Sequence, residues 1–78
     1  MSKNIVAGLQ SLSVNALGMT GADMDIIRSE KRPVKEVDYG FVGDVKKVRG
    51  DMLATLIRTG VVPVLAPLTH DGKGQLLN

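Results

Sequence analysis

The side chains that could do acid–base chemistry are few, and the first pair is His70 with Asp71. A histidine titrates near neutral pH, so it can take up and release protons under physiological conditions. Adjacent residues seldom point at one substrate atom, however, and no activated serine or cysteine is recognisable beside this pair. We therefore expect His70 and Asp71 to lie in a solvent-exposed turn.

The second candidate is the D-x-D pair Asp23 and Asp25, whose side chains would share one face of a strand. Two carboxylates on one face could bind a divalent cation, but no third ligand is recognisable. We expect both on the surface and predict no metal site. The GKGQ stretch at residues 72–75 lacks the glycine spacing and the following Ser or Thr of a Walker A loop. We interpret it as a glycine-rich turn that begins with Asp71.

The third candidate is Asn78, because of its position. An apolar strand is expected at residues 61–66, and a polar turn at residues 70–74 follows it. In α/β proteins, ligands gather where strands end and loops begin, so we look for function at the carboxyl end of this strand and around Asn78. An asparagine amide offers two donors and an acceptor, which suits a ligand that bears a carboxylate or an amide. Taken alone, Asn78 could equally be a turn residue.

Composition narrows the class of protein. The chain has 78 residues, 44% of them hydrophobic, which indicates one small domain or a piece of a larger one. Ten basic residues nearly balance eight acidic ones, and aromatic residues make up only 3%, so we expect no nucleic-acid partner. The absence of cysteine fits a reducing compartment. No apolar run is long enough for a bilayer and no signal peptide is recognisable, so we expect no membrane partner.

Two amphipathic helices are predicted in the part of the chain that positions the candidate residues. Apolar residues recur at helical spacing from Ile5 to Leu12 and from Met52 to Ile57, which predicts helices over residues 3–12 and 49–59. Ser2 is expected to cap the first helix. Gly60 stands where the second helix needs a left-handed residue to end.

Strands are predicted at residues 14–19, 24–29, 39–48 and 61–66. The middle two indicate a hairpin with a long, charged connection around Pro33. Gly40 and Gly43 are expected to mark bulges or close backbone approach. Residues 61–66 are apolar on both faces, which is typical of a buried parallel strand, with Pro63 near its start.

This order of elements predicts an α/β fold with at least one parallel pair. A parallel sheet needs cover on both faces, and this chain offers two helices in all. We therefore expect the chain to be part of something larger, or to associate with itself along exposed strand edges.

Several stretches, read in order, resemble one family. They are GMTGAD at residues 18–23, VDYGFVGDV at 37–45, GVVPVLAP at 60–67 and DGKGQLLN at 71–78. They are similar to the G-L-x-G-x-D turn, the D-x-G-x-V-G-x-V hairpin strand, the G-x-x-P-V-x-x-P strand and the D-G-Q-L-x-N segment of the N-acetylglutamate kinases, in the amino acid kinase superfamily. The resemblance runs from about Lys3 to Asn78.

The resemblance implies a three-layer αβα fold and a kinase of arginine biosynthesis. Such an enzyme transfers the γ-phosphoryl group of ATP to the γ-carboxylate of N-acetyl-L-glutamate. The first Asn of the family's N-x-N-A-D segment contacts the acylated substrate, and it maps onto Asn78. ATP with Mg²⁺, a cytoplasmic location and a homo-oligomer are expected for the full-length enzyme. An N-succinyl substrate is an open alternative to the N-acetyl one.

The departures from the family are large. Several parts of the family's pattern are missing from these residues. They are the K-x-G-G phosphate loop, the second glycine pair, the substrate-binding Arg, the Asp that organises the catalytic lysines, the second catalytic Lys and the ATP-binding half. Residues 1–78 are therefore expected to be a single partial domain, the central part of the N-terminal, acyl-amino-acid-binding half. We predict no catalytic residue in this chain, no bound cofactor and no activity on its own. The alternative is a non-catalytic α/β module that works by association.

Overall fold

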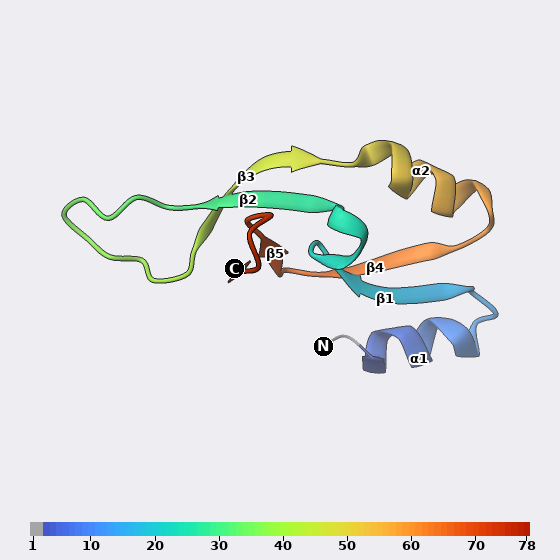
Figure 1. Ribbon diagram of the computed structural model, residues 1–78. Helices are drawn as coiled ribbons and strands as arrows, with labels where there is room; N and C mark the ends of the chain where they lie inside the picture. The colour runs from blue at the N-terminus through green and yellow to red at the C-terminus, as the bar shows by residue number, and fades with distance from the viewer. Residues whose placement is uncertain (1–2) are drawn as a thin grey trace.

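The computed structural model describes residues 3–78, and the chain is elongated (Figure 1). Its radius of gyration is 14.5 Å and its extents are 48 × 25 × 18 Å. A compact domain of this length would have a radius of gyration of about 11–12 Å. Much of the chain therefore has no second layer to pack against. Ser2, the expected helix cap, lies outside the described residues.

Both predicted helices are confirmed. Helix α1 spans Lys3–Ser11 and helix α2 spans Gly50–Arg58. At the end of α2 the N–H of Gly60 donates to the Ile57 carbonyl and the N–H of Val61 donates to the Leu56 carbonyl. These two bonds form a Schellman motif, which needs a left-handed residue at Gly60, and its φ is +88°. Within residues 3–78, no helix has the length and apolarity required to cross a bilayer.

The α/β prediction is also confirmed, with a parallel pair at its centre. Strand β1 (Ala16–Thr20) runs parallel to strand β4 (Val62–Ala66), and Pro63 stands second in its strand. Helix α1 contacts β1 and helix α2 contacts β4, and Figure 1 shows the pair lying between the two helices. No residue of β4 is buried, so the expectation of a strand covered on both faces is wrong for the described chain. With one neighbouring strand and one helix, β4 lacks the cover that a central strand has.

The predicted hairpin is present, but its strands are shorter than expected. Strand β2 (Ile27–Lys31) pairs antiparallel with strand β3 (Gly43–Val48), and the long loop between them projects from the body (Figure 1). Residues 24 and 25 were expected in the first strand, but they belong to the 3₁₀ helix η1 (Asp23–Asp25) and have φ of 53° and 54°. A left-handed backbone cannot continue a strand.

The start of the second hairpin strand differs for a similar reason. The Asp38 carboxylate accepts the N–H of Gly40 at 2.8 Å, and Gly40 has φ of +68°, so a turn replaces the expected strand over residues 39–42. The register shift lies between Arg28 and Ser29, not at either glycine. Close approach is confirmed at Gly43, where a Cβ would lie 2.8 Å from the Ser29 Cβ.

Two short strands were not predicted. Strand β5 (Thr69–His70) pairs parallel with β2, and strand β6 (Leu76–Leu77) pairs antiparallel with β5. The second sheet therefore has the order β3-β2-β5-β6. Its formation brings the last ten residues of the chain against the hairpin.

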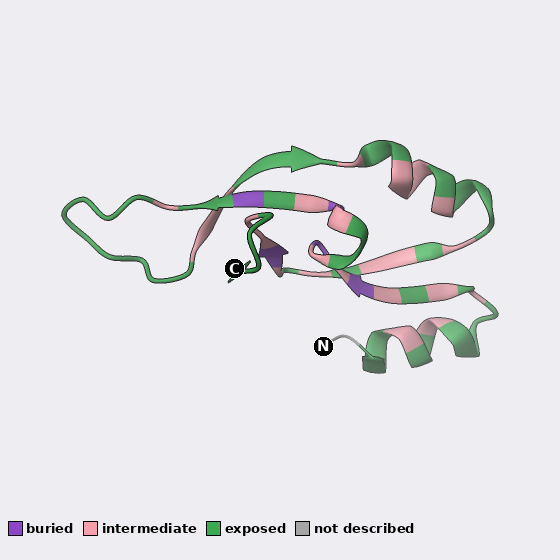
Figure 2. Cartoon of the chain, in the orientation of Figure 1, coloured by how far each residue is buried: buried purple, intermediate pink, exposed green. Residues whose placement is uncertain are grey.

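The core of the described chain is small. Its buried apolar residues are Met19 of β1, Ile26 directly before β2, and Leu77 of β6. Figure 2 shows buried segments only in the middle of the chain's long axis, with exposed residues over the hairpin loop and on both helices. Even helix residues of the predicted apolar stripes, Ile5 and Ile57, are about 60% exposed (58% and 60%). The chain thus presents much apolar surface that nothing in residues 3–78 covers.

Candidate functional site

The carboxyl ends of β1 and β4 meet, as expected for parallel strands. Thr20 and Ala66 are register partners at these ends. The loops that follow touch at once, because the N–H of Gly21 donates to the Leu68 carbonyl at 2.7 Å. A Cβ at Gly21 would lie 2.9 Å from that oxygen and 2.8 Å from the Ile27 Cβ, so only glycine permits this approach. The two loops meet at one edge of the sheet, which contains the candidate site.

Asp23 closes the first loop. Its Oδ2 accepts the N–H of Thr20 at 2.6 Å and the hydroxyl of Thr20 at 3.1 Å. The Thr20 hydroxyl in turn accepts the N–H of Ala22 at 3.1 Å. Asp23 and Asp25 therefore do not share a strand face, because this side-chain turn ends β1 and folds the chain into η1. Within residues 3–78, no group of three possible metal-ligating side chains comes together.

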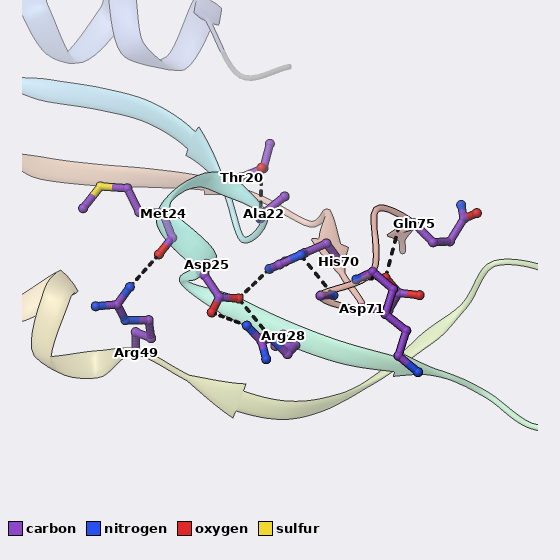
Figure 3. A network of polar contacts seen from close by, with 11 residues as sticks. Thr20, Ala22, Met24, Asp25, Arg28, Arg49, His70, Asp71 and Gln75 are labelled. Carbon is purple, nitrogen blue, oxygen red and sulfur yellow. Dashed lines mark hydrogen bonds and ion pairs between the residues drawn. The ribbon is translucent and has the colours of Figure 1, made fainter.

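Asp25 lies at the centre of a second network, drawn in Figure 3. Its Oδ2 accepts from Arg28 Nη2 at 2.7 Å, and its Oδ1 lies 2.5 Å from His70 Nε2. The hydrogen bonds from Arg28, and then from His70, hold the pKa of the Asp25 carboxyl below its usual 3.8. Arg49 Nη1 adds a bond to the Met24 carbonyl at 3.1 Å. The left-handed pair of residues 24 and 25 is thus fixed by contacts from three other parts of the chain.

His70 does not lie in the exposed turn that its sequence context suggested. It belongs to β5, directly beside Arg28 of β2 in the parallel register, and its side chain is only 19% exposed. Its contact with Asp25 joins residues 45 positions apart in the sequence. No local pattern around either residue signals this pairing.

The predicted glycine-rich turn is confirmed after His70. Asp71 Oδ1 accepts the N–H of Lys73 at 2.7 Å and that of Gln75 at 3.1 Å, and these bonds lower the pKa of the Asp71 carboxyl. Gly72 and Gly74 have φ of +79° and +92°. The N–H groups of Lys73 and Gln75 are thus engaged by the chain's own carboxylate, which argues against a phosphate-binding loop.

Asn78 is held by its main chain and free in its side chain. Its N–H donates to the Phe41 carbonyl and its carbonyl accepts from the Gly43 N–H, both at 2.9 Å. The preceding residue, Leu77, is 1% exposed. Among the hydrogen bonds of residues 3–78, none involves the Asn78 amide, and the residue is exposed. The arrangement therefore presents an amide side chain from a fixed backbone.

A cleft of about 570 Å³ opens inside the hairpin, and sequence reasoning did not identify it. Arg32 crosses it with an ion pair to Asp44, whose nearest atoms are 2.8 Å apart, and lies 5.0 Å from the centre of the Tyr39 ring. The Arg32 guanidinium lowers the pKa of the Asp44 carboxyl. The cleft is lined by Arg32, Pro33, Lys35, Glu36, Val37, Tyr39 and Asp44.

Comparison with known proteins agrees with the motifs. Residues 1–78 match the family described as "Amino acid kinase family". The chain is 72% identical over 78 residues to the acetylglutamate kinase of Parabacteroides distasonis and covers 31% of that protein. It is 73% identical over 78 residues to the acetylglutamate kinase of Bacteroides thetaiotaomicron, covering 30%.

A more distant relative aligns as completely. The acetylglutamate kinase of Methanopyrus kandleri is 43% identical over 82 residues, which include the whole of this chain and 33% of that protein. The chain thus spans about a third of the length of the curated relatives it matches. The resemblance inferred from the motifs is confirmed.

Proposed function

The chain belongs to the amino acid kinase family, and on this premise we propose that it is part of an acetylglutamate kinase. The full-length protein would transfer the γ-phosphoryl group of ATP to the γ-carboxylate of an N-acylated L-glutamate, a step of arginine biosynthesis. The identity of 70–73% to acetylglutamate kinases over all 78 residues carries this proposal. A cytoplasmic location goes with this biosynthetic role.

The role we assign to this chain is to hold the acyl-amino-acid substrate. Phosphoryl transfer depends on positioning and on neutralising the charge of the phosphates, with little covalent chemistry for the protein. The Asn78 amide nitrogen would donate to a carboxylate or acyl oxygen, and its Oδ1 would accept from the substrate amide N–H. Its backbone bonds to Phe41 and Gly43 support this role, because they fix the Cα from which the amide reaches out. No catalytic residue is proposed in this chain.

ATP is a substrate of the proposed reaction, and Mg²⁺ would neutralise its phosphates when bound. The described residues do not fit a site for the ion, because no three possible metal-ligating side chains gather among residues 3–78. The glycine-rich turn at residues 71–75 does not suit phosphate either, since Asp71 occupies its N–H groups. The described residues are therefore assigned no contact with Mg²⁺ or with the ATP phosphates.

The proposal also makes residues 1–78 a partial domain, the central part of the acyl-amino-acid-binding half. The elongated shape supports it, as do the apolar residues exposed on the parallel pair, among them Leu17, Val62 and Leu65. The remaining two thirds of the protein would cover these residues and extend the two-stranded sheet at its open edges. A homo-oligomer is part of the same proposal.

An assay of the complete reading frame tests this function. Hydroxylamine traps the acyl phosphate product as a hydroxamate, and N-acetylglutamate and N-succinylglutamate are offered in parallel, with and without ATP. ATP-dependent hydroxamate formation by the full-length protein, and none by the 78-residue chain, is the expected result. The preferred substrate identifies the acyl group. No product from either substrate with the full-length protein refutes the proposal.

A second function, association without catalysis, is favoured by one observation, the exposed apolar surface of a chain with open sheet edges. The reading frame separates the two. A frame that continues beyond Asn78 into N-x-N-A-D, with K-x-G-G upstream, supports the kinase. A frame that stops at Asn78, together with a stable oligomer of the 78-residue chain in sedimentation, supports the association module.

A further inference from the structure

The His70 imidazole uses both of its ring nitrogens. Nε2 lies 2.5 Å from Asp25 Oδ1, and Nδ1 accepts the N–H of Gly72 at 3.2 Å. A backbone N–H can only donate, so Nδ1 carries no proton in this geometry. An ionised carboxylate can only accept, so Nε2 carries the proton. The two contacts together require the neutral imidazole with its proton on Nε2.

On one side, this imidazole touches a firmly anchored carboxylate. Asp25 is also bound by Arg28 through two hydrogen bonds, of 3.2 Å and 2.7 Å. The backbone at Asp25 is left-handed, as it is at Met24. Such a conformation persists where surrounding contacts hold it, so Asp25 has little freedom to follow a moving partner.

On the other side, the imidazole touches the turn that leads to Asn78. Gly72 packs on the Arg28 side chain so closely that a Cβ there would lie 3.1 Å from Arg28 Cζ. The turn then leads into β6, whose Leu76 is the register partner of His70 and whose Leu77 is buried. Asn78 follows directly, so a shift of the turn would be passed along two strand residues to the proposed substrate-binding amide.

We propose that His70 is a positioning residue for the acyl-amino-acid substrate: as the Nε2–H tautomer it ties the turn of residues 71–75 to Asp25 and so sets the place of the Asn78 amide. This inference rests on the proposed kinase function. The contact between His70 and Asp25 is lost when either the imidazole or the carboxylate is removed. The effects of the two substitutions on substrate binding should therefore not be additive.

The tautomer is measured directly and needs no variant. Imidazole ¹⁵N NMR of the full-length protein distinguishes a protonated Nε2 from a protonated Nδ1. We expect His70 to be the Nε2–H tautomer at neutral pH. A proton on Nδ1 in the neutral ring overturns the inference, whatever the activity of the enzyme.

Kinetics of the full-length enzyme test the positioning role. His70→Ala and Asp25→Gly are each expected to raise the KM for the acylated glutamate about 2- to 10-fold, the value of one hydrogen bond. The KM for ATP and kcat should change less than about twofold, and the double variant should be no worse than either single one. Asp25→Gly is chosen because glycine tolerates the left-handed backbone.

Two matched variants control for local disturbance. Met24→Gly makes the same kind of backbone change at the neighbouring left-handed position, and Lys73→Ala alters an exposed side chain of the same turn. Both should leave the KM for the acylated glutamate unchanged. An active enzyme in which His70→Ala and Asp25→Gly also leave this KM unchanged overturns the inference alone. A wild-type enzyme without activity refutes the proposed function, and the NMR result stands apart from it.

Discussion

Replacing Gly43 by alanine puts a methyl group where the structure has no room. An added Cβ would lie 2.8 Å from the Ser29 Cβ, 3.0 Å from the Leu77 Cβ and 3.2 Å from Leu77 Cδ1. Ser29 and Leu77 are 3% and 1% exposed, and two of the three contacts are with Cβ atoms, which move only with the backbone. Overpacking of this kind costs about 1–3 kcal/mol. Strand β3 should therefore separate from Leu77 and weaken the hydrogen bond from Gly43 to the Asn78 carbonyl.

The loss of folding stability is measured by urea unfolding, with circular dichroism as the probe. Gly50→Ala is the matched control, because nothing lies within 4 Å of a Cβ at that helical position. Gly50→Ala should be neutral or stabilising by up to about 1 kcal/mol, while Gly43→Ala should destabilise by about 1–3 kcal/mol. In the proposed full-length kinase, Gly43→Ala should also raise the KM for the acylated glutamate. An unfolding midpoint of Gly43→Ala equal to that of wild type would refute the packing argument.

The same unfolding assay tests three further expectations. Gly60→Ala, at φ of +88°, should destabilise the protein by about 1–2 kcal/mol. Gly8→Ala, in open space on α1, should stabilise it by about 0.5–1 kcal/mol. Equal unfolding midpoints of the two variants would contradict the helix-stop assignment. Met24→Gly should raise stability by up to about 1 kcal/mol, because its left-handed φ of 53° is strained for methionine; a lower midpoint would contradict this. Arginine partners hold the folded-state pKa values of Asp25 and Asp44 below 3.8, so the folded state binds fewer protons than the unfolded state. The stability from these contacts should be complete above about pH 5 and lost as pH falls through the folded pKa values; an equal midpoint at pH 3 and pH 7 would argue against it.

Local patterns predicted what local forces determine. The apolar spacing of both helices and the glycine at position 60 were sufficient to predict α1, α2 and the end of α2, because each depends on residues within a few positions. The apolar run at residues 61–66 likewise indicated a parallel strand, although its partner β1 could not be named. The glycine at position 43 was correctly associated with close approach, although its partner Leu77 could not be named.

The remaining features depend on contacts between distant residues. Strands β5 and β6 have two residues each, too few to show a period. They form because β5 pairs with the distant strand β2 and β6 pairs with β5. Residues 24 and 25 have a left-handed backbone although neither is glycine. Their sequence therefore gives no sign that η1 replaces the start of the predicted strand. His70 was assigned to an exposed turn because Asp25, its partner, lies 45 positions away.

The exposed apolar surface is consistent with a chain that is part of a larger protein. The two helices each cover one side of the β1–β4 pair, yet Leu17 and Val62 remain 42% and 44% exposed. In the proposed full-length kinase these residues would face the rest of the protein. The network around Asp25 and the backbone of Asn78 lie beside the second sheet: Asp25 contacts Arg28 of β2 and His70 of β5, and Asn78 follows β6.

The most direct test of the substrate-binding role is the KM for the acylated glutamate of full-length Asn78→Ala, compared with wild type. Loss of a hydrogen bond to a charged ligand costs about 1.5–3 kcal/mol, so this KM should rise at least about tenfold while the KM for ATP stays unchanged. Lys73→Ala, an exposed position in the turn of residues 71–75 that leads to Asn78, serves as the control. An Asn78→Ala enzyme with wild-type KM for both substrates would contradict the assignment of this chain to the acyl-amino-acid site.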